Sequence, residues 1–239
     1  MKRLLPVISI AVMLVLFAGP AMAKMKGEVN LFLGMKNVKD SDFERIEFLP
    51  PEEFPNSTLD VSSMSEYGIG ANFGGVDWPV MIAVDFLMAS EDDAYNFEYY
   101  GDYQFRLDAE LETTEIDVGV RKFWTNHDKF HPYVGGGVAF IDADAELALF
   151  GPDVLPLRQT TEWFSQCASD SGTGLWLNTG VLWRITPRLS LGFDLRYSDA
   201  SVDFVFDDEI VPDRQVEEDG TWKADVGGLH YGLLFGFRW

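Results

Sequence analysis

Short runs of strictly alternating apolar and polar residues are the feature that most constrains this chain. In residues 229–239, LHYGLLFGFRW, large apolar side chains occupy the odd positions, while small or polar residues occupy most of the even ones. Successive side chains of a β-strand point to opposite faces, so this run predicts a strand with one apolar face. A strand of a soluble β-sandwich can look the same, and the rest of the chain has to distinguish the two.

Eight runs of this kind occur along the chain, and we expect each to form a strand. Most of them are about 9 to 11 residues long, which is the length that a tilted strand needs to cross a bilayer. A glycine run hides the parity in the first half of the fifth one. The runs are residues 27–36, 66–75, 78–88, 115–121, 132–149, 175–184, 189–197 and 229–239.

The connections between these runs alternate in length. Three are tight turns rich in Gly, Pro, Asn and Asp, namely GGVDWP, TNHDKFHP and ITPR. The other four are long and cover residues 37–65, 90–112, 150–172 and 199–227. This alternation is typical of bacterial outer-membrane barrels, which have short periplasmic turns and long extracellular loops, and a compact soluble domain seldom carries four such loops. The sequence therefore predicts an all-β fold, an eight-stranded antiparallel transmembrane β-barrel.

The first residues indicate export. Lys2 and Arg3 precede an apolar run, and Ala21 to Ala23 form a small-x-small cleavage site, as in a secretory signal peptide. The run is shorter than the roughly 20 apolar residues of a membrane helix. We expect residues 1–23 to be a cleaved signal peptide, residues 24–239 to be the barrel domain, and the protein to reach the outer membrane of a Gram-negative cell.

The chain is strongly acidic, with a formal net charge of −21. This charge argues against nucleic acid and anionic lipid headgroups as direct partners, because both need a basic face. Cys167 is the single cysteine, so an intramolecular disulfide is excluded. We expect Cys167 to be a free thiol in a loop, with an intermolecular disulfide as the alternative.

The face of each strand opposite the apolar one carries charges of both signs. In a narrow lumen such charges must pair or stay hydrated, because an unpaired buried charge costs several kcal/mol. We therefore predict an internal network of salt bridges and water. Its members are Lys26, Glu28, Asp85, Glu115, Asp117, Arg121, Asp142, Asp144, Arg184, Asp194, Arg196 and Arg238.

Aromatic residues near the ends of the runs predict the two membrane boundaries, because Trp and Tyr concentrate at both membrane–water interfaces. Trp78, Trp124, Trp183, Phe237 and Trp239 fall near the short turns, and Tyr67 and Tyr197 fall toward the long loops.

One stretch departs from the pattern. Leu107, Ala109 and Leu111 occupy odd positions, whereas the apolar residues Ile116 and Val118 occupy even ones, so we expect a β-bulge or register change near Thr113. The two strands would then continue past the bilayer. The tyrosine-rich residues 95–103 would stand above the membrane surface, where strand addition could bind a partner.

The residues give little support for catalysis or metal binding. We find no Ser/His/acid cluster around the three histidines, and we expect His230 to be a hydrogen-bonded lumen residue. One cysteine and no close histidine pair argue against a transition-metal site. The acidic stretches SEDD, FDDEIVPD and VEEDG are expected to be solvated, with Ca²⁺ or Mg²⁺ binding as the alternative. We expect no cofactor and no enzymatic activity.

The chain resembles the small eight-stranded outer-membrane barrels of the OmpA/OmpX/OmpW type. The resemblance covers the signal peptide, the start GEVNLFLG, the stretch PYVGGGVAF and the end LLFGFRW. It implies that the terminal strand is also recognised by the barrel-assembly machinery, and it implies outer-membrane lipid and lipopolysaccharide as surroundings. The implied assembly signal consists of Tyr231, Leu233, Phe235, Phe237 and Trp239.

Three classes of function remain. The first is a non-enzymatic envelope protein with a polar, filled lumen and acidic loops that serve a structural or surface-interaction role. The second is a narrow channel or an OmpW-like conduit for small molecules, which needs a hydrophobic gap beside the inward residues Trp176, Leu182 and Leu234. The third, a lipid-modifying enzyme, lacks the residues it would need.

Overall fold

The computed structural model describes residues 25–38, 46–47, 58–99, 103–125, 127–152, 160–205 and 221–239. The predicted signal peptide and the acidic stretches FDDEIVPD and VEEDG lie outside these ranges. In the ranges that are described, no helix is long and apolar enough to cross a membrane.

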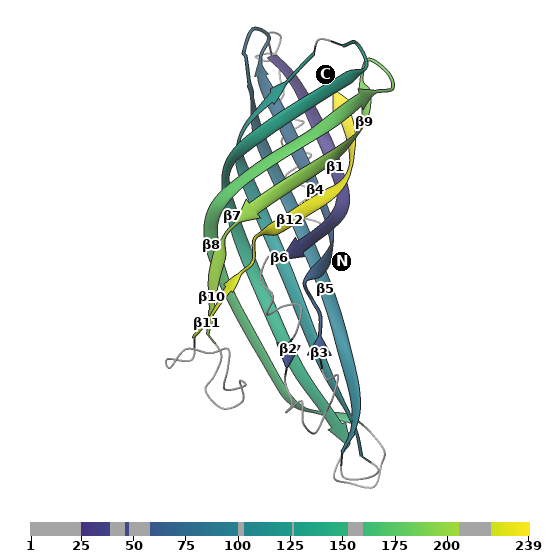
Figure 1. The fold of residues 1–239 in the computed structure, drawn as a ribbon, viewed down its shortest axis with the longest axis vertical. Coiled ribbons are helices and arrows are strands. Elements are labelled where there is room, and N and C mark those ends of the chain that lie inside the picture. Colours follow the sequence, from purple (N-terminus) through teal and green to yellow (C-terminus); the bar gives the residue numbers. More distant parts are fainter. Residues whose placement is uncertain are drawn as a thin grey trace.

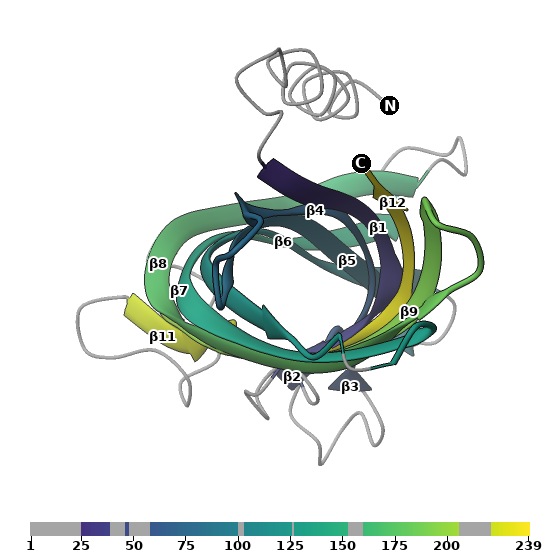
Figure 2. The same cartoon turned by 90° about the horizontal axis from the view of Figure 1, so that it is seen from above.

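Eight antiparallel strands form a closed ring, which confirms the predicted fold (Figures 1 and 2). In ring order, each strand pairs with the one that follows it along the chain, and the last strand pairs back with the first. The strands are β1 (Met25–Val38), β4 (Ser63–Gly75), β5 (Met81–Tyr99), β6 (Tyr103–Phe123), β7 (Phe130–Pro152), β8 (Thr160–Arg184), β9 (Leu189–Asp199) and β12 (Gly228–Arg238). The short pairs β2 (Ile46–Glu47) with β3 (Thr58–Leu59) and β10 (Ser201–Val205) with β11 (Thr221–Asp225) lie in two of the long connections.

The ring closes where β1 meets β12. Their register pairs Glu28 with Arg238 and continues without a shift to Val38 and Gly228. Beyond β12, the backbone N–H of Trp239 donates to the carbonyl of Gly27 at 3.2 Å. Within lipid every backbone polar group must be paired internally, and a closed ring leaves no unpaired edge.

An apolar belt surrounds the outside of the ring, and it contains the residues whose outward parity was predicted. On β8, for example, Leu177 is 67% exposed while its neighbour Trp176 is 1% exposed. The predicted aromatic residues at both ends of the belt are also exposed. These predicted residues are Tyr67, Trp78, Trp124, Trp183, Tyr197, Phe237 and Trp239.

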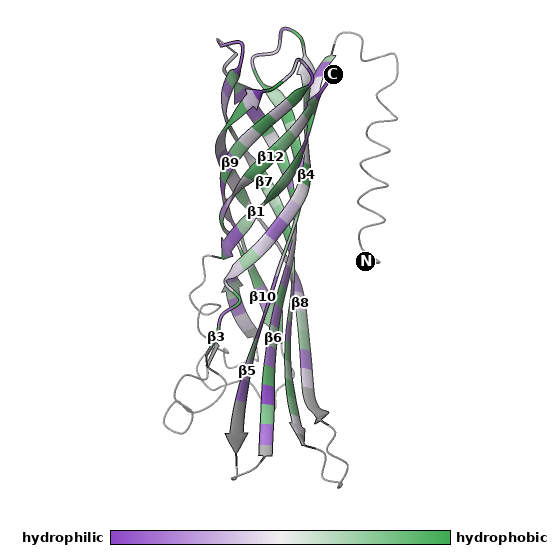
Figure 3. Cartoon of the chain, turned by 90° about the vertical axis from the view of Figure 1, so that its right-hand side faces the viewer, coloured by the Kyte–Doolittle hydropathy of each residue, from purple (hydrophilic) through white to green (hydrophobic). Residues whose placement is uncertain are grey.

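Four strands continue far past this belt. β5 to β8 are 19, 21, 23 and 25 residues long, and they project beyond the ends of β1, β9 and β12 (Figure 3). The predicted continuation of two strands into residues 90–112, past the bilayer, is confirmed. The long connection predicted at residues 150–172 was wrong, because most of that segment is strand. Cys167 is free and exposed as expected, but it lies on β8 and not in a loop.

The predicted bulge near Thr113 was wrong as well. β6 pairs with β5 and with β7 in one continuous register through this position. Odd-numbered side chains face inward along the whole described strand, from Leu107 (1% exposed) to Asp117 (0%). The environment changes while the parity does not. Past the belt the outside is polar, so apolar residues occupy the inward positions of the strand and polar residues occupy the outward ones.

Beyond the belt, these inward residues form an apolar core. We call it the second apolar core, because another apolar cluster lies elsewhere in the lumen. Leu107, Leu111 and Ile141 from β6 and β7 pack there with Phe204 and Trp222 from β10 and β11. Leu59, Val61 and Met64, which precede or begin β4, belong to the same core. Tyr95 packs against it too, so this tyrosine contributes to the interior and not to a surface patch.

Inward glycines make room for large inward side chains. Gly70 on β4 lies opposite Asp85 on β5, and a Cβ at Gly70 would overlap Asp85 Oδ1. Gly74, further along the same face, has only ordinary contacts at the Cβ position, 3.4 Å from the Trp78 ring.

We expect Gly70→Ala to lower the free energy of unfolding by about 1–3 kcal/mol, because the displaced Asp85 side chain is fixed by other contacts. Gly74→Ala should leave it unchanged or slightly higher, since alanine suits a strand better than glycine. Urea titration of the refolded protein, followed by tryptophan fluorescence, measures both. Equal effects of the two variants would contradict this explanation of Gly70.

Candidate functional site: the charged interior and its mouth

Two arginines share one aspartate in the centre of the barrel interior. Arg121 on β6 donates through both terminal nitrogens to Asp85 on β5. Arg196 on β9 donates Nη2–H to Asp85 Oδ2 at 2.8 Å. All three side chains are 5% exposed or less, so the ion pairs are shielded from water.

Further acceptors surround the two guanidinium groups. Arg196 also donates to Asp117 on β6, and its Nε lies 3.6 Å from Asp194 Oδ2. Asp194 in turn accepts from the Tyr133 hydroxyl and from Asn178 Nδ2 at 2.9 Å. These bonds join strands on opposite sides of the lumen, which ties the wall together from within.

Trp176 on β8 covers both cations from one side. The guanidinium carbons of Arg121 and Arg196 each lie 5.4 Å from the centre of its ring. A cation over an indole face is attracted by the ring quadrupole, and more strongly when it is desolvated. Trp176 therefore fills space and stabilises charge together.

A second group of polar residues lies next to the first. Lys36 on β1 donates to Thr113 Oγ1 at 3.2 Å and to Glu115 Oε2 at 3.3 Å. His230 on β12 contacts Glu66 Oε1 through Nδ1 at 2.7 Å and Ser198 Oγ through Nε2 at 2.9 Å. The expectation that His230 is a hydrogen-bonded lumen residue is confirmed.

Ser198, His230 and Glu66 thus have the order of contacts found in a hydrolase triad. The prediction that no Ser/His/acid cluster surrounds a histidine was therefore wrong. Its three members come from β9, β12 and β4, which are distant in the sequence. Ser198 is 0% exposed, and its hydroxyl also lies 3.4 Å from Glu115 Oε2. A buried serine beside a carboxylate neither admits a substrate nor stabilises an oxyanion.

An apolar cluster fills another part of the lumen. Phe32, Leu87, Tyr133, Leu182 and Leu234 pack together there, with Phe123 against them. The inward placement predicted for Leu182 and Leu234 is therefore observed. Both side chains are buried in this packed cluster.

The twelve charges predicted for the lumen divide into three groups. Six are buried in the networks described above, namely Asp85, Glu115, Asp117, Arg121, Asp194 and Arg196. Four line a cavity at the short-turn end, namely Lys26, Glu28, Arg184 and Arg238. Asp142 and Asp144 do not face the lumen. Both are exposed on the outside of β7 beyond the belt, where the polar face points outward.

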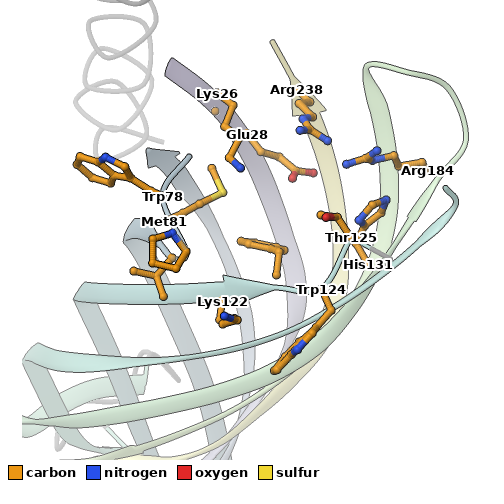
Figure 4. Close-up of a pocket in the computed structure, with 14 residues that line it drawn as sticks. Lys26, Glu28, Trp78, Met81, Lys122, Trp124, Thr125, His131, Arg184 and Arg238 are labelled. Carbon is orange, nitrogen blue, oxygen red and sulfur yellow. The ribbon is translucent and has the colours of Figure 1, made fainter. Parts of the chain in front are cut away.

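The cavity at the short-turn end is the mouth of the barrel (Figure 4). Its volume is about 370 Å³, and its lining includes Lys26, Arg184, Arg238 and His131. Glu28 also lines it and accepts a hydrogen bond from Ser190 Oγ at 2.5 Å. The mouth therefore carries more positive than negative groups, in contrast to the whole chain.

Sequence reasoning missed several members of the interior. The predicted network did not include Lys36, Glu66, Tyr133 or Asn178. Their inward parity was the available signal. In the described part of the chain, no three His, Cys, Asp or Glu side chains are grouped so as to hold a metal ion.

Residues 9–230 match the model of the outer membrane protein beta-barrel domain family. The chain belongs to this family. It is accordingly a transmembrane β-barrel protein of the outer membrane. A search of curated proteins found no relative with significant sequence similarity.

Solved structures of outer-membrane proteins are similar to this chain at low sequence identity. OprG from Pseudomonas aeruginosa is 11% identical with a TM-score of 0.50, covering 90% of this chain and 95% of OprG. A major outer membrane protein from Thermus thermophilus is 13% identical (TM-score 0.45; 90% and 99% covered). Ail of Yersinia pestis, solved with the heparin analogue sucrose octasulfate, is 12% identical (TM-score 0.44; 90% and 99% covered).

We expect Asp85→Asn to destabilise the barrel by about 3–5 kcal/mol, because it leaves two buried guanidinium groups without their shared carboxylate. Asp142→Asn removes the same charge from the outer face and should change stability by less than about 0.5 kcal/mol. The midpoint of urea unfolding and the temperature of the heat-induced gel shift report both effects. A similar loss of stability in the two variants would argue against placing Asp85 inside the lumen and Asp142 on the outer face.

Proposed function

We propose that the protein is a non-enzymatic barrel with a closed interior that serves a structural or surface-interaction role. The observation that carries this proposal is the filled lumen. Buried ion pairs, a tryptophan stacked on two arginines, and two apolar clusters occupy the interior. Eight strands leave an interior just wide enough for side chains to fill, and here they fill it.

The projecting part of β5 to β8 supports the interaction role. Its inner face packs on the second apolar core, which stabilises the projection. Its outer face presents carboxylates to water, with Asp92, Glu110, Asp142, Asp144 and Glu146 exposed. With the short turns in the periplasm, this acidic surface would stand outside the cell, where it would favour solubility and basic partners.

The proposal also covers how the protein is exported and assembled and which lipids surround it. Residues 1–23 would be a signal peptide, and the barrel-assembly machinery would recognise the terminal strand. Leu233, Phe235, Phe237 and Trp239 of that strand are 43% to 49% exposed on the outer face, where a partner or lipid can reach them. The belt would contact lipopolysaccharide in the outer leaflet and phospholipid in the inner one.

The conduit alternative needs an open path between the apolar inward residues. Leu182 and Leu234 are 2% and 8% exposed and belong to one cluster, and Trp176 belongs to the other. Close packing of this kind argues for a plug and against a passage.

We expect the refolded protein to give no discrete conductance steps in a planar bilayer, because side chains block the lumen. Heat-shifted gel mobility shows that the barrel has closed before the recording, and a known porin in the same bilayer is the positive control. Reproducible steps from well-folded protein would overturn the proposal and favour a narrow channel.

We expect a fluorophosphonate serine probe to leave Ser198 unlabelled in the folded protein, because the hydroxyl is buried beside Glu115. Mass spectrometry of the digested protein measures the labelling, and Ser198→Ala provides the blank. Stoichiometric labelling that disappears in Ser198→Ala would contradict a non-enzymatic role.

A further inference from the structure

The mouth at the short-turn end concentrates positive charge in an acidic protein. Lys26 on β1, Arg184 on β8 and Arg238 on β12 all line the same cavity. Lys26 Nζ donates to the Val76 carbonyl at 3.3 Å. Neither arginine forms an ion pair within 4.0 Å with a described residue.

The strand order brings the two arginines together. β9 lies between β8 and β12, and Ser190 on β9 pairs with Arg184 on one side and with Gly236 on the other. The backbones of β8 and β12 are therefore about 10 Å apart, two strand spacings. The guanidinium groups point toward each other across this interval (Figure 4). Two like charges held this way repel unless an anion lies between them.

The Glu28 carboxylate fills only part of this position. Glu28 sits on β1, and its side chain reaches across β12 to accept a short hydrogen bond from Ser190 Oγ on β9. One carboxylate also cannot balance Lys26, Arg184 and Arg238. The mouth therefore keeps a net positive charge.

His131 supplies a second, independent observation. Its side chain is 3% exposed and lines the cavity, yet Nδ1 has no hydrogen-bond partner. Nε2 lies 3.5 Å from the Asp128 carbonyl, at the limit of a hydrogen bond. A buried ring nitrogen without a hydrogen-bond partner costs free energy unless a ligand or water satisfies it.

We propose that this mouth binds a phosphate group, carried either by an anionic phospholipid headgroup or by a free phosphate ion. Arginine presents a planar fork of N–H donors that matches phosphate oxygens, and two such forks face one another here. The cavity of about 370 Å³ lies within the size range of small-molecule sites. Trp78 and Trp124 at its rim are exposed at the level of the membrane interface, within reach of a headgroup.

The acidity of the whole chain does not oppose this site. Charges separated by more than about 10 Å are largely screened at ordinary ionic strength. The exposed carboxylates of β5 to β8 lie at the opposite end of the strands. Local charge at the mouth therefore decides what binds there. This proposal stands apart from the closed-lumen role, since a plugged barrel can still bind a ligand at its mouth.

Calorimetric titration of the protein in dodecyl maltoside micelles tests the proposal with two probes, inorganic phosphate and dihexanoyl phosphatidylglycerol. Dihexanoyl glycerol, which lacks the phosphate, controls for binding of the acyl chains. We expect Arg184→Gln with Arg238→Gln to weaken binding at least about tenfold, the loss of one or two charge-assisted hydrogen bonds.

The matched control is Lys129→Gln with Arg188→Gln. Both side chains are exposed in the neighbouring turns and do not line the cavity, so this variant removes the same charge and should bind within about twofold of the unaltered protein. Heat-shifted mobility confirms folding of each variant, and the single arginine variants replace the double one if it does not fold.

Binding of phosphatidylglycerol alone supports a lipid headgroup, and binding of both probes supports a free phosphate site. The proposal is overturned if the unaltered protein binds neither probe. It is equally overturned if dihexanoyl glycerol binds as tightly, or if the control variant loses as much affinity as the arginine variant.

Discussion

The sharing of Asp85 by Arg121 and Arg196 is the constraint on which the rest of the interior depends. A guanidinium group inside a closed wall has no bulk water to hydrate it, so its terminal N–H groups pair with carboxylates from other strands. Gly70 leaves space for the aspartate, and Trp176 covers the two cations. The lumen is therefore an internal brace, and its composition follows from the need to pair these charges.

The long strands show that the apolar face of a β-strand is set by what surrounds that part of the strand. The inward face is polar where lipid lies outside and apolar where water lies outside. Along β6 the odd side chains face inward throughout, but they change from Leu107 and Leu111 beyond the belt to Glu115 and Asp117 within it. Lipid outside demands an apolar exterior, and water outside permits an apolar interior. One continuous strand satisfies both conditions by exchanging the characters of its two faces at the membrane boundary.

The ring, its strand number and the belt could be predicted because lipid imposes one uniform rule on all outward positions. The same rule misassigned Asp142 and Asp144 and suggested a bulge at Thr113, since it was applied where water had replaced lipid. The contact of Ser198 with His230 and Glu66 was beyond sequence reasoning, because it depends on the stagger of β4, β9 and β12 around the ring. An odd or even position in a strand predicts whether a side chain points inward or outward. It does not predict the level along the barrel axis at which the side chain lies.

The seam between β1 and β12 has a consequence for how the barrel forms. Glu28 pairs with Arg238, and the Trp239 ring lies over Gly27, so the first and last parts of the fold depend on each other. Contacts between such distant positions carry a large loop-closure entropy and form slowly. Until β1 pairs with β12, each of these strands exposes an unpaired edge, and the chain is vulnerable to aggregation and proteolysis. A chain truncated before its last strand would keep the pairing of β1 with β4 but leave the other edge of β1 open.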